Sequence, residues 1–231
     1  MGQRSPTPET VPARSPDDAY SGVVLSPDEL EAALSSGYEL RGLELKGPGP
    51  RTDAQLFAKV TRAALSMGNL RDGGHVIVGI DDAAPAAMLP GLQGEDLNSW
   101  LAFDDVARKM AEYADPPLRF DIAGVRVSSG VTVAVIQIFE FADIPHLCAR
   151  DYPGVLRKGA LYVRPRKVPE TSEVASSIEM REVIDLATEK ALRSYIETAE
   201  RAGLRLGVSE REPEIPSDEE RYDEERARGW L

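Results

Sequence analysis

Cysteine is nearly absent from this chain of 231 residues, which contains only Cys148. A single cysteine excludes an internal disulfide framework and a cysteine-rich zinc site. The two histidines, His75 and His146, have no companions at metal-ligand spacing, and no serine, histidine and aspartate pattern can be placed as a catalytic triad. We therefore expect Cys148 to be a small buried hydrophobic residue rather than a nucleophile.

Long apolar runs are missing as well. The sequence contains no stretch of about 18 apolar residues, the length that a membrane-spanning helix needs. Its first residues are polar and rich in proline, unlike a secretion signal. We expect a cytoplasmic protein without a membrane partner.

The net charge is -12, an excess of acid that by itself disfavours binding to phosphates. Most of this excess lies outside residues 38–182. Inside that range, the stretch RDYPGVLRKGALYVRPRK, residues 150–167, is strongly basic, and we call it the basic strip. An ordinary solvated strand edge is the alternative reading. The strip supplies these candidate nucleic-acid contacts: Arg157, Lys158, Arg164, Arg166 and Lys167, with Tyr162 as a stacking residue.

Hydrophobic periodicity predicts an alternation of helices and strands, which indicates an α/β or α+β fold with a mixed sheet. Ser26 and Glu29 form a capping box before the first helix, and Thr52 with Gln55 forms a second one. The predicted helices cover 26–37, 52–69, 95–114 and 176–203, and the predicted strands cover 38–47, 73–82, a hairpin over 118–141, and 160–165.

The chain is expected to contain one principal domain with flanking segments. We expect a disordered lead over residues 1–22, the domain over 23–182, a carboxy-terminal helix over 183–206 and a charged tail over 207–231. The tail is a candidate for binding another protein.

Carboxylates stand at the ends of two predicted strands: Glu39, Glu44, Asp81 and Asp82. If the two strands are neighbours, these groups converge and would hold a hard divalent cation such as Mg²⁺ or Mn²⁺. Ideal strand alternation places Glu39 and Glu44 on opposite faces, so a bulge at Gly42 would be needed to bring them together. The alternative is that the glutamates are exposed strand residues and that the two aspartates cap a turn.

The glycine pair Gly73–Gly74 stands in the stretch NLRDGGHVIVG. Glycine pairs let a backbone approach a phosphate or adopt a positive φ. These glycines precede a strand instead of opening a helix, and neither a P-loop nor a dinucleotide fingerprint is present. We expect a tight turn.

Taken in order, the motifs E....LELK, ALSMGNLRDGGHVIVGIDD, LPGL and GALYVRPRKVPETSEVAS resemble the AlbA-like domain of the Schlafen family over residues 38–182. The resemblance implies an Alba-like mixed sheet with flanking helices. The domain occurs in many bacterial proteins as a DNA-binding domain and in animal Schlafens as part of a nuclease.

In the nuclease members, two glutamates five apart and a later aspartate form a metal-dependent site that cleaves structured RNA such as tRNA. The resemblance implies that Glu39, Glu44 and either Asp81 or Asp82 are catalytic acids, with Lys46 as the lysine of the motif. Glu39, Glu44 and Asp82 would then hold Mg²⁺ or Mn²⁺. Because the family nuclease pairs two such lobes, a homodimer is expected here.

The resemblance thus implies a nucleic-acid-binding protein that acts as an endoribonuclease, with RNA favoured over DNA as the partner, in stress or phage defence. A non-catalytic DNA-binding regulator or assembly adaptor is the alternative. A third hypothesis is a protein-interaction module whose acidic flanks block its own basic strip when no partner is bound.

Overall fold

The computed structural model describes residues 25–35, 41–81, 83–166 and 170–204. The chain divides into two compact units, Met1–Ala187 and Thr188–Leu231. The described elements confirm the α+β class, with five α-helices and a mixed sheet. In chain order they are α1 (Pro27–Ser35), β1 (Leu43–Lys46), α2 (Ala54–Gly68), β2 (Gly74–Val78), the 3-10 helix η2 (Pro85–Ala87), α3 (Gly94–Leu101), α4 (Phe103–Ala111), β3 (Ala114–Asp115), β4 (Phe120–Arg126), β5 (Thr132–Ile138), β6 (Leu147–Cys148), β7 (Tyr162–Val163), β8 (Ser172–Glu173) and α5 (Ser177–Arg201).

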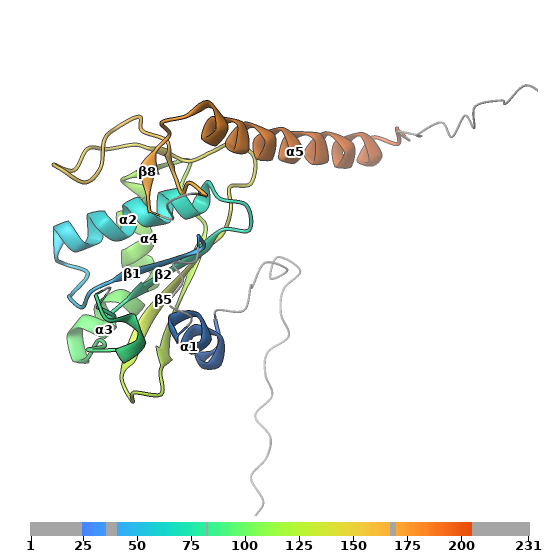
Figure 1. Cartoon of the computed structure of the whole chain (residues 1–231). Helices are drawn as coiled ribbons and strands as arrows, with labels where there is room; N and C mark the ends of the chain where they lie inside the picture. The colour runs from blue at the N-terminus through green and yellow to red at the C-terminus, as the bar shows by residue number, and fades with distance from the viewer. Residues whose placement is uncertain (1–24, 36–40, 82, 167–169, 205–231) are drawn as a thin grey trace, which may run out of the picture. The chain divides into compact units, whose positions relative to one another are not determined.

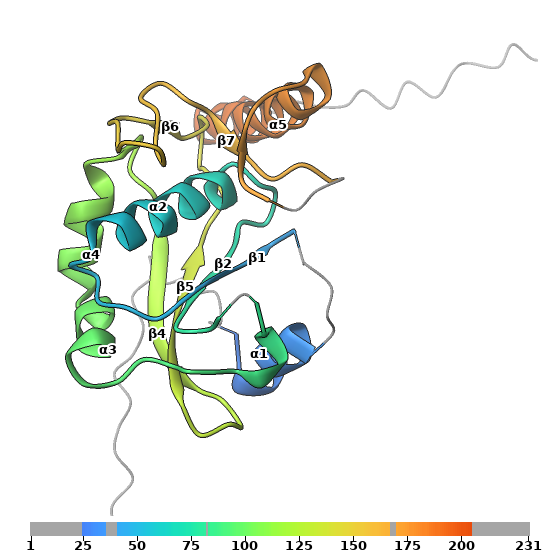
Figure 2. The same cartoon turned by 60° about the vertical axis from the view of Figure 1, so that its left-hand side comes forward.

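The central sheet has four strands in the order β1-β2-β5-β4, of which Figure 1 labels the first three and Figure 2 all four. Strands β1 and β2 are parallel and are joined through α2, so the predicted neighbourhood of these two strands is confirmed. The pairs β2–β5 and β5–β4 are antiparallel, and β4 with β5 forms the predicted hairpin. The second predicted strand therefore lies in the interior of the sheet.

Helices cover both faces of this sheet. Val76 and Val78 point into the larger core cluster, which includes residues of α2, α3 and α4. Ile77 lies in a second cluster with Leu30 and Leu34 of α1. Figure 2 shows α2 and α1 on opposite sides of the strands. Burial on both faces explains why β2 reads as a nearly continuous apolar run.

The helix starts follow local capping chemistry. The backbone N–H of Ser26 donates to Glu29 at 2.9 Å and the N–H of Glu29 donates to the Ser26 hydroxyl at 3.3 Å, which confirms the first capping box. The second was wrong, because the cap of α2 is Asp53. Its carboxylate accepts hydrogen bonds from the N–H groups of Gln55 and Leu56 at 2.9 and 3.0 Å. A charged acceptor at a helix N-terminus also interacts favourably with the helix dipole.

The single helix predicted over 95–114 is two helices, α3 and α4. They are separated at Ala102, whose φ of -74° and ψ of 78° are not helical. Trp100 is fully buried at the end of α3 and its ring stacks on Phe57, with the centroids 5.9 Å apart. Two aspartates in the first turn of α4 favour a new helix start.

The predicted strand over 160–165 is shorter than expected. It comprises only β7, which pairs with β8 in a small sheet separate from the central one. The predicted terminal helix is confirmed as α5. In the described part of the chain, no helix combines the length and apolar character needed to cross a bilayer.

Candidate nucleic-acid interface

Glu44 of β1 lies in a compact ion-pair cluster. Leu43 and Leu45 pack toward the α1 side of the sheet, so alternation places Glu44 and Lys46 on the opposite side. One carboxylate oxygen of Glu44 accepts from the Lys46 ammonium and the other accepts from the guanidinium of Arg164. The Glu44 side chain is 19% exposed and that of Arg164 only 2%. Glu44 is therefore neither an exposed strand residue nor an acid without a charged partner.

The two cations set the ionisation of Glu44. Burial raises the pKa of its carboxyl, but the charges and hydrogen bonds of Lys46 and Arg164 outweigh this and hold the pKa below its ordinary value. Glu44 is accordingly a carboxylate at neutral pH.

Arg164 joins distant parts of the chain. Its Nη2 donates to the carbonyl of Leu43 at 3.0 Å, and its own carbonyl accepts from Nε of Arg41 at 2.6 Å. Its Nε is buried without a hydrogen-bond partner among the described residues. Arg164 was predicted as a phosphate contact. It follows β7 directly, and its buried guanidinium is paired with Glu44 of β1.

Of the other acids predicted for the metal site, only Asp81 lies in the described part of the chain. Asp81 is exposed beyond the end of β2, and its carboxylate accepts from the N–H of Ala83 at 3.0 Å, which is the turn-capping alternative. Glu39 and Asp82 lie outside the described residues. Among the residues described, no three histidine, cysteine, aspartate or glutamate side chains are placed to hold a metal ion.

The predicted metal site needs a bulge at Gly42 that interrupts the strand alternation, and the structure has a turn there instead. Arg41 and Gly42 form a turn, and β1 begins only at Leu43. A turn rather than a bulge therefore sets the start of the strand. The position of Glu39 relative to Glu44 lies outside the described residues.

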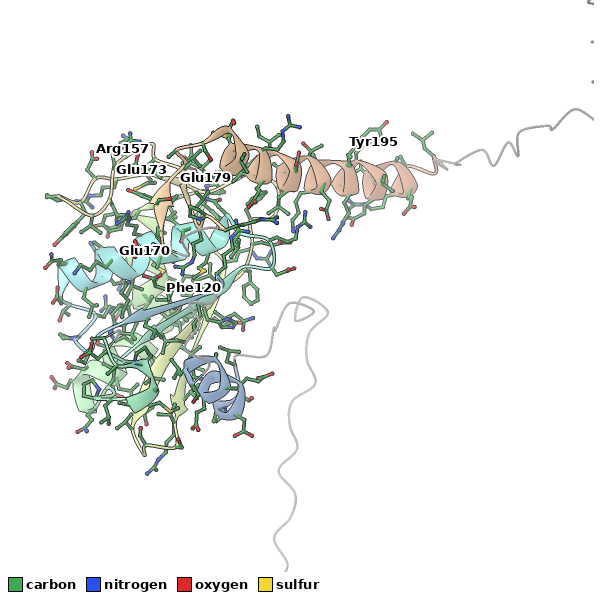
Figure 3. All side chains as sticks on the ribbon, viewed as in Figure 1. Phe120, Arg157, Glu170, Glu173, Glu179 and Tyr195 are labelled. Atoms are coloured by element: carbon green, nitrogen blue, oxygen red, sulfur yellow. The ribbon has the colours of Figure 1, made fainter. Side chains whose placement is uncertain are left out.

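The exposed arginines of the basic strip are paired with acids of this same chain. Arg157 contacts both carboxylate oxygens of Glu173, and Figure 3 shows the two residues side by side. Nε of Arg166 lies 2.6 Å from Glu182 of α5. The backbone of Lys158 donates to Asp151 at 2.8 Å, and this lysine is exposed. The last predicted contact, Lys167, lies outside the described residues.

Tyr162 is buried in the larger core cluster. Its hydroxyl accepts from the backbone N–H of Arg157 at 2.8 Å, and the guanidinium of Arg62 lies 5.4 Å from the ring centroid. Burial raises the pKa of the phenol. The ring belongs to the core and presents no free face for stacking on a base.

A cavity of about 610 Å³ lies beside the ion-pair cluster. Four arginines line it, and they come from the turn before β1, the α2–β2 loop and the segment after β7: Arg41, Arg71, Arg164 and Arg166. The cavity is also lined by His75 and by four acidic residues, as many as its arginines: Asp72, Glu179, Glu182 and Asp185. Arg41 and Arg71 were missed in the sequence because neither lies in a basic stretch; only the fold brings them to the basic strip.

Comparisons with known proteins identify no family. No protein-family model matches the sequence, and no curated protein matches it. Among solved structures, the chain is similar to the DIP2311 protein from Corynebacterium diphtheriae, with 16% identity over 67% of this chain and 27% of that chain and a TM-score of 0.44. It is also similar to the N-terminal domain of a RecG-related protein from Nitrosomonas europaea, with 19% identity over 66% of this chain and 91% of that domain and a TM-score of 0.38. Both TM-scores lie below 0.5, so the site must be interpreted from its own geometry.

Proposed function

We propose that this chain binds nucleic acid, and that the arginine-lined cavity with the basic strip forms its phosphate-binding surface. The observation that supports this most is the convergence of Arg41, Arg71 and Arg166, from three separate segments, on one cavity. Arg164 also lines the cavity, but its guanidinium is held in the ion pair with Glu44. The planar guanidinium matches phosphate oxygens in pairs and keeps its charge at any physiological pH. The net charge of the chain is -12, so binding of a polyanion would depend on the local positive potential of this surface.

Replacing Arg166 by glutamine is expected to weaken binding to a fluorescently labelled tRNA by about threefold at low salt, because one exposed phosphate contact is lost. The slope of log K against log salt should fall by about 0.7 to 0.9. Arg166 is 76% exposed, so the variant keeps its fold. Fluorescence anisotropy across a salt series measures both quantities, on tRNA and on duplex DNA.

The matched control is Lys59→Gln, which removes the same charge from an exposed position of α2 that does not line the cavity. Equal losses for Arg166→Gln and Lys59→Gln would reduce the interface to a general charge effect. Failure of the unaltered chain to bind either nucleic acid at low salt would refute the proposed function.

A metal-dependent endoribonuclease is the more specific form of this proposal. It is supported by the resemblance to the Schlafen family. Strands β1 and β2 are parallel neighbours, but their register pairs Lys46 with Val78, so Asp81 and Asp82 follow that pair by three and four residues in the sequence. Mg²⁺ or Mn²⁺ held by Glu39, Glu44 and Asp82 would supply a Lewis acid for the scissile phosphate. The described residues do not by themselves fit the ion, since both oxygens of Glu44 are bonded to Lys46 and Arg164.

Incubation of a tRNA pool with the chain and Mn²⁺ tests the nuclease. Cleavage that EDTA abolishes, and that Asp82→Asn reduces by at least about 100-fold through loss of a metal ligand, is the expected result. Asp81→Asn is the matched control, because Asp81 caps a turn through its own loop. RNA left intact by a chain that still binds it would leave the non-catalytic regulator as the function.

A further inference from the structure

Glu182 of α5 bridges two arginines that are far apart in sequence. Its Oε2 lies 2.5 Å from Nη2 of Arg41, and its Oε1 lies 2.6 Å from Nε of Arg166. The three side chains line the same cavity. One carboxylate thus forms ion pairs with two guanidinium groups that line the cavity proposed to bind phosphates.

This arrangement is the one that a phosphate group requires. Two guanidinium groups converge on a pair of oxygens that share one negative charge, which is the geometry of arginine pairs on phosphodiesters. We propose that Arg41 and Arg166 form a phosphate clamp within the nucleic-acid interface and that Glu182 occupies this clamp in the free chain. The inference rests on the proposed function and adds to it a competition between an internal acid and the ligand.

The contacts of Glu182 are of a kind that a ligand can displace. The side chains of Arg41, Arg166 and Glu182 are 31%, 76% and 28% exposed. Exposed ion pairs contribute only about 0 to 1 kcal/mol to stability, so exchanging the carboxylate for a phosphate leaves the fold intact. Arg164 differs, because its guanidinium is buried against Glu44 and cannot turn toward a ligand without leaving a buried carboxylate.

The same chain segment covers the basic strip at a second point. Arg157 is paired with Glu173 of β8, nine residues before Glu182 in the sequence. Both acids belong to one stretch that passes along the strip, and each neutralises an exposed arginine. A carboxylate held in the same molecule acts at a high effective concentration, so it competes well against a single free phosphate and less well against a polyanion with many phosphates.

Glu182 is charged when the competition takes place. Burial raises the pKa of its carboxyl, and the hydrogen bonds and charges of Arg41 and Arg166 more than reverse this, so the pKa lies below its ordinary value. Replacement by glutamine therefore removes a full negative charge at neutral pH while keeping the shape of the side chain.

The test compares Glu182→Gln with Asp185→Asn in the full chain. Asp185 lies on α5 and lines the same cavity, and its replacement changes the net charge by the same amount without freeing the two arginines. Glu182→Gln is expected to bind labelled tRNA about tenfold more tightly at low salt and to raise the salt slope by about 1 to 2, since up to two new phosphate contacts form. Asp185→Asn should change affinity less than about twofold.

Two further measurements separate the possible failures. Adding Arg41→Gln to Glu182→Gln should return the affinity to that of the unaltered chain or below it. Inorganic phosphate, used alone, should raise the melting temperature of Glu182→Gln more than that of Asp185→Asn, because ligand binding to the folded state stabilises it. Where the unaltered chain binds tRNA, equal affinity gains for the two single variants, or no gain for Glu182→Gln, overturn the clamp. A phosphate effect on Glu182→Gln without nucleic-acid binding by any variant would retain the clamp and refute the proposed function.

Discussion

Replacing Glu44 by glutamine is expected to lower the free energy of unfolding by about 3 kcal/mol. The change leaves the guanidinium of Arg164 buried opposite a neutral amide, and its side chain is only 2% exposed. An arginine cannot lose its proton to escape this cost, unlike a buried lysine. Urea denaturation of the unaltered chain and the variant measures the difference.

The matched control for Glu44→Gln is Glu182→Gln, which breaks ion pairs that are more exposed than the Glu44–Arg164 pair and should change stability by less than about 1 kcal/mol. Combining Glu44→Gln with Arg164→Met should cost less than the two single changes together, because the buried guanidinium is removed along with its carboxylate partner. Similar stabilities for Glu44→Gln and Glu182→Gln would contradict the buried pair.

The pH dependence gives the same prediction a second readout. The folded-state pKa of Glu44 is lower than its ordinary value, so its contribution is complete above the unfolded-state pKa. It is lost as the pH falls through the folded-state pKa. The stability difference between the unaltered chain and Glu44→Gln should therefore shrink in acid.

The stability of Glu44→Gln also matters for the nuclease test, because loss of RNA cleavage in a Glu44 variant counts as catalytic only where the variant is shown to be folded.

Replacing Gly73 by alanine is expected to lower the free energy of unfolding by at least about 2 kcal/mol, through two separate effects. Gly73 has a φ of +70°, which favours glycine. A Cβ at this position would also lie 2.0 Å from the carbonyl oxygen of Ile138, a backbone atom of β5 that cannot move without disturbing the sheet. Gly73 directly follows the turn at Arg71 and Asp72, near the tight turn that the sequence predicts, and it also allows a close approach to the backbone of β5.

Gly154→Ala separates the two effects. Gly154 has the same φ of +70° and nothing within 4 Å of a Cβ, so its replacement should cost only about 1 kcal/mol from the backbone conformation. The difference between the two alanine variants, measured by thermal or urea unfolding, reports the backbone clash. Equal losses of stability would contradict the clash, because they would mean that the backbone around Ile138 moves aside with little loss of free energy.

Local signals in the sequence predicted much of the fold. The alternation of 118–141 gave the β4–β5 hairpin, and Ser26 with Glu29 gave the start of α1, because both depend on residues close together in sequence. The break at Ala102 was missed because no proline or glycine marks it in the sequence, and only the backbone angles of Ala102 show that the helix is interrupted. The basic strip was recognised as a run of charges, but burial of Tyr162 could not be seen from that run.

The sequence by itself determined the class of fold and the charged residues available, namely two acids near one strand and a group of arginines in an acidic chain. Only the tertiary structure decided which charges meet. Arg164 reaches Glu44 across 120 residues of sequence and Arg41 reaches Glu182 across 141, so no local pattern could pair them. Periodicity reports which face of an element is buried, whereas an ion pair depends on where two elements pack. The glutamate of β1 was therefore predicted as half of a metal site, and the fold places it opposite a buried arginine.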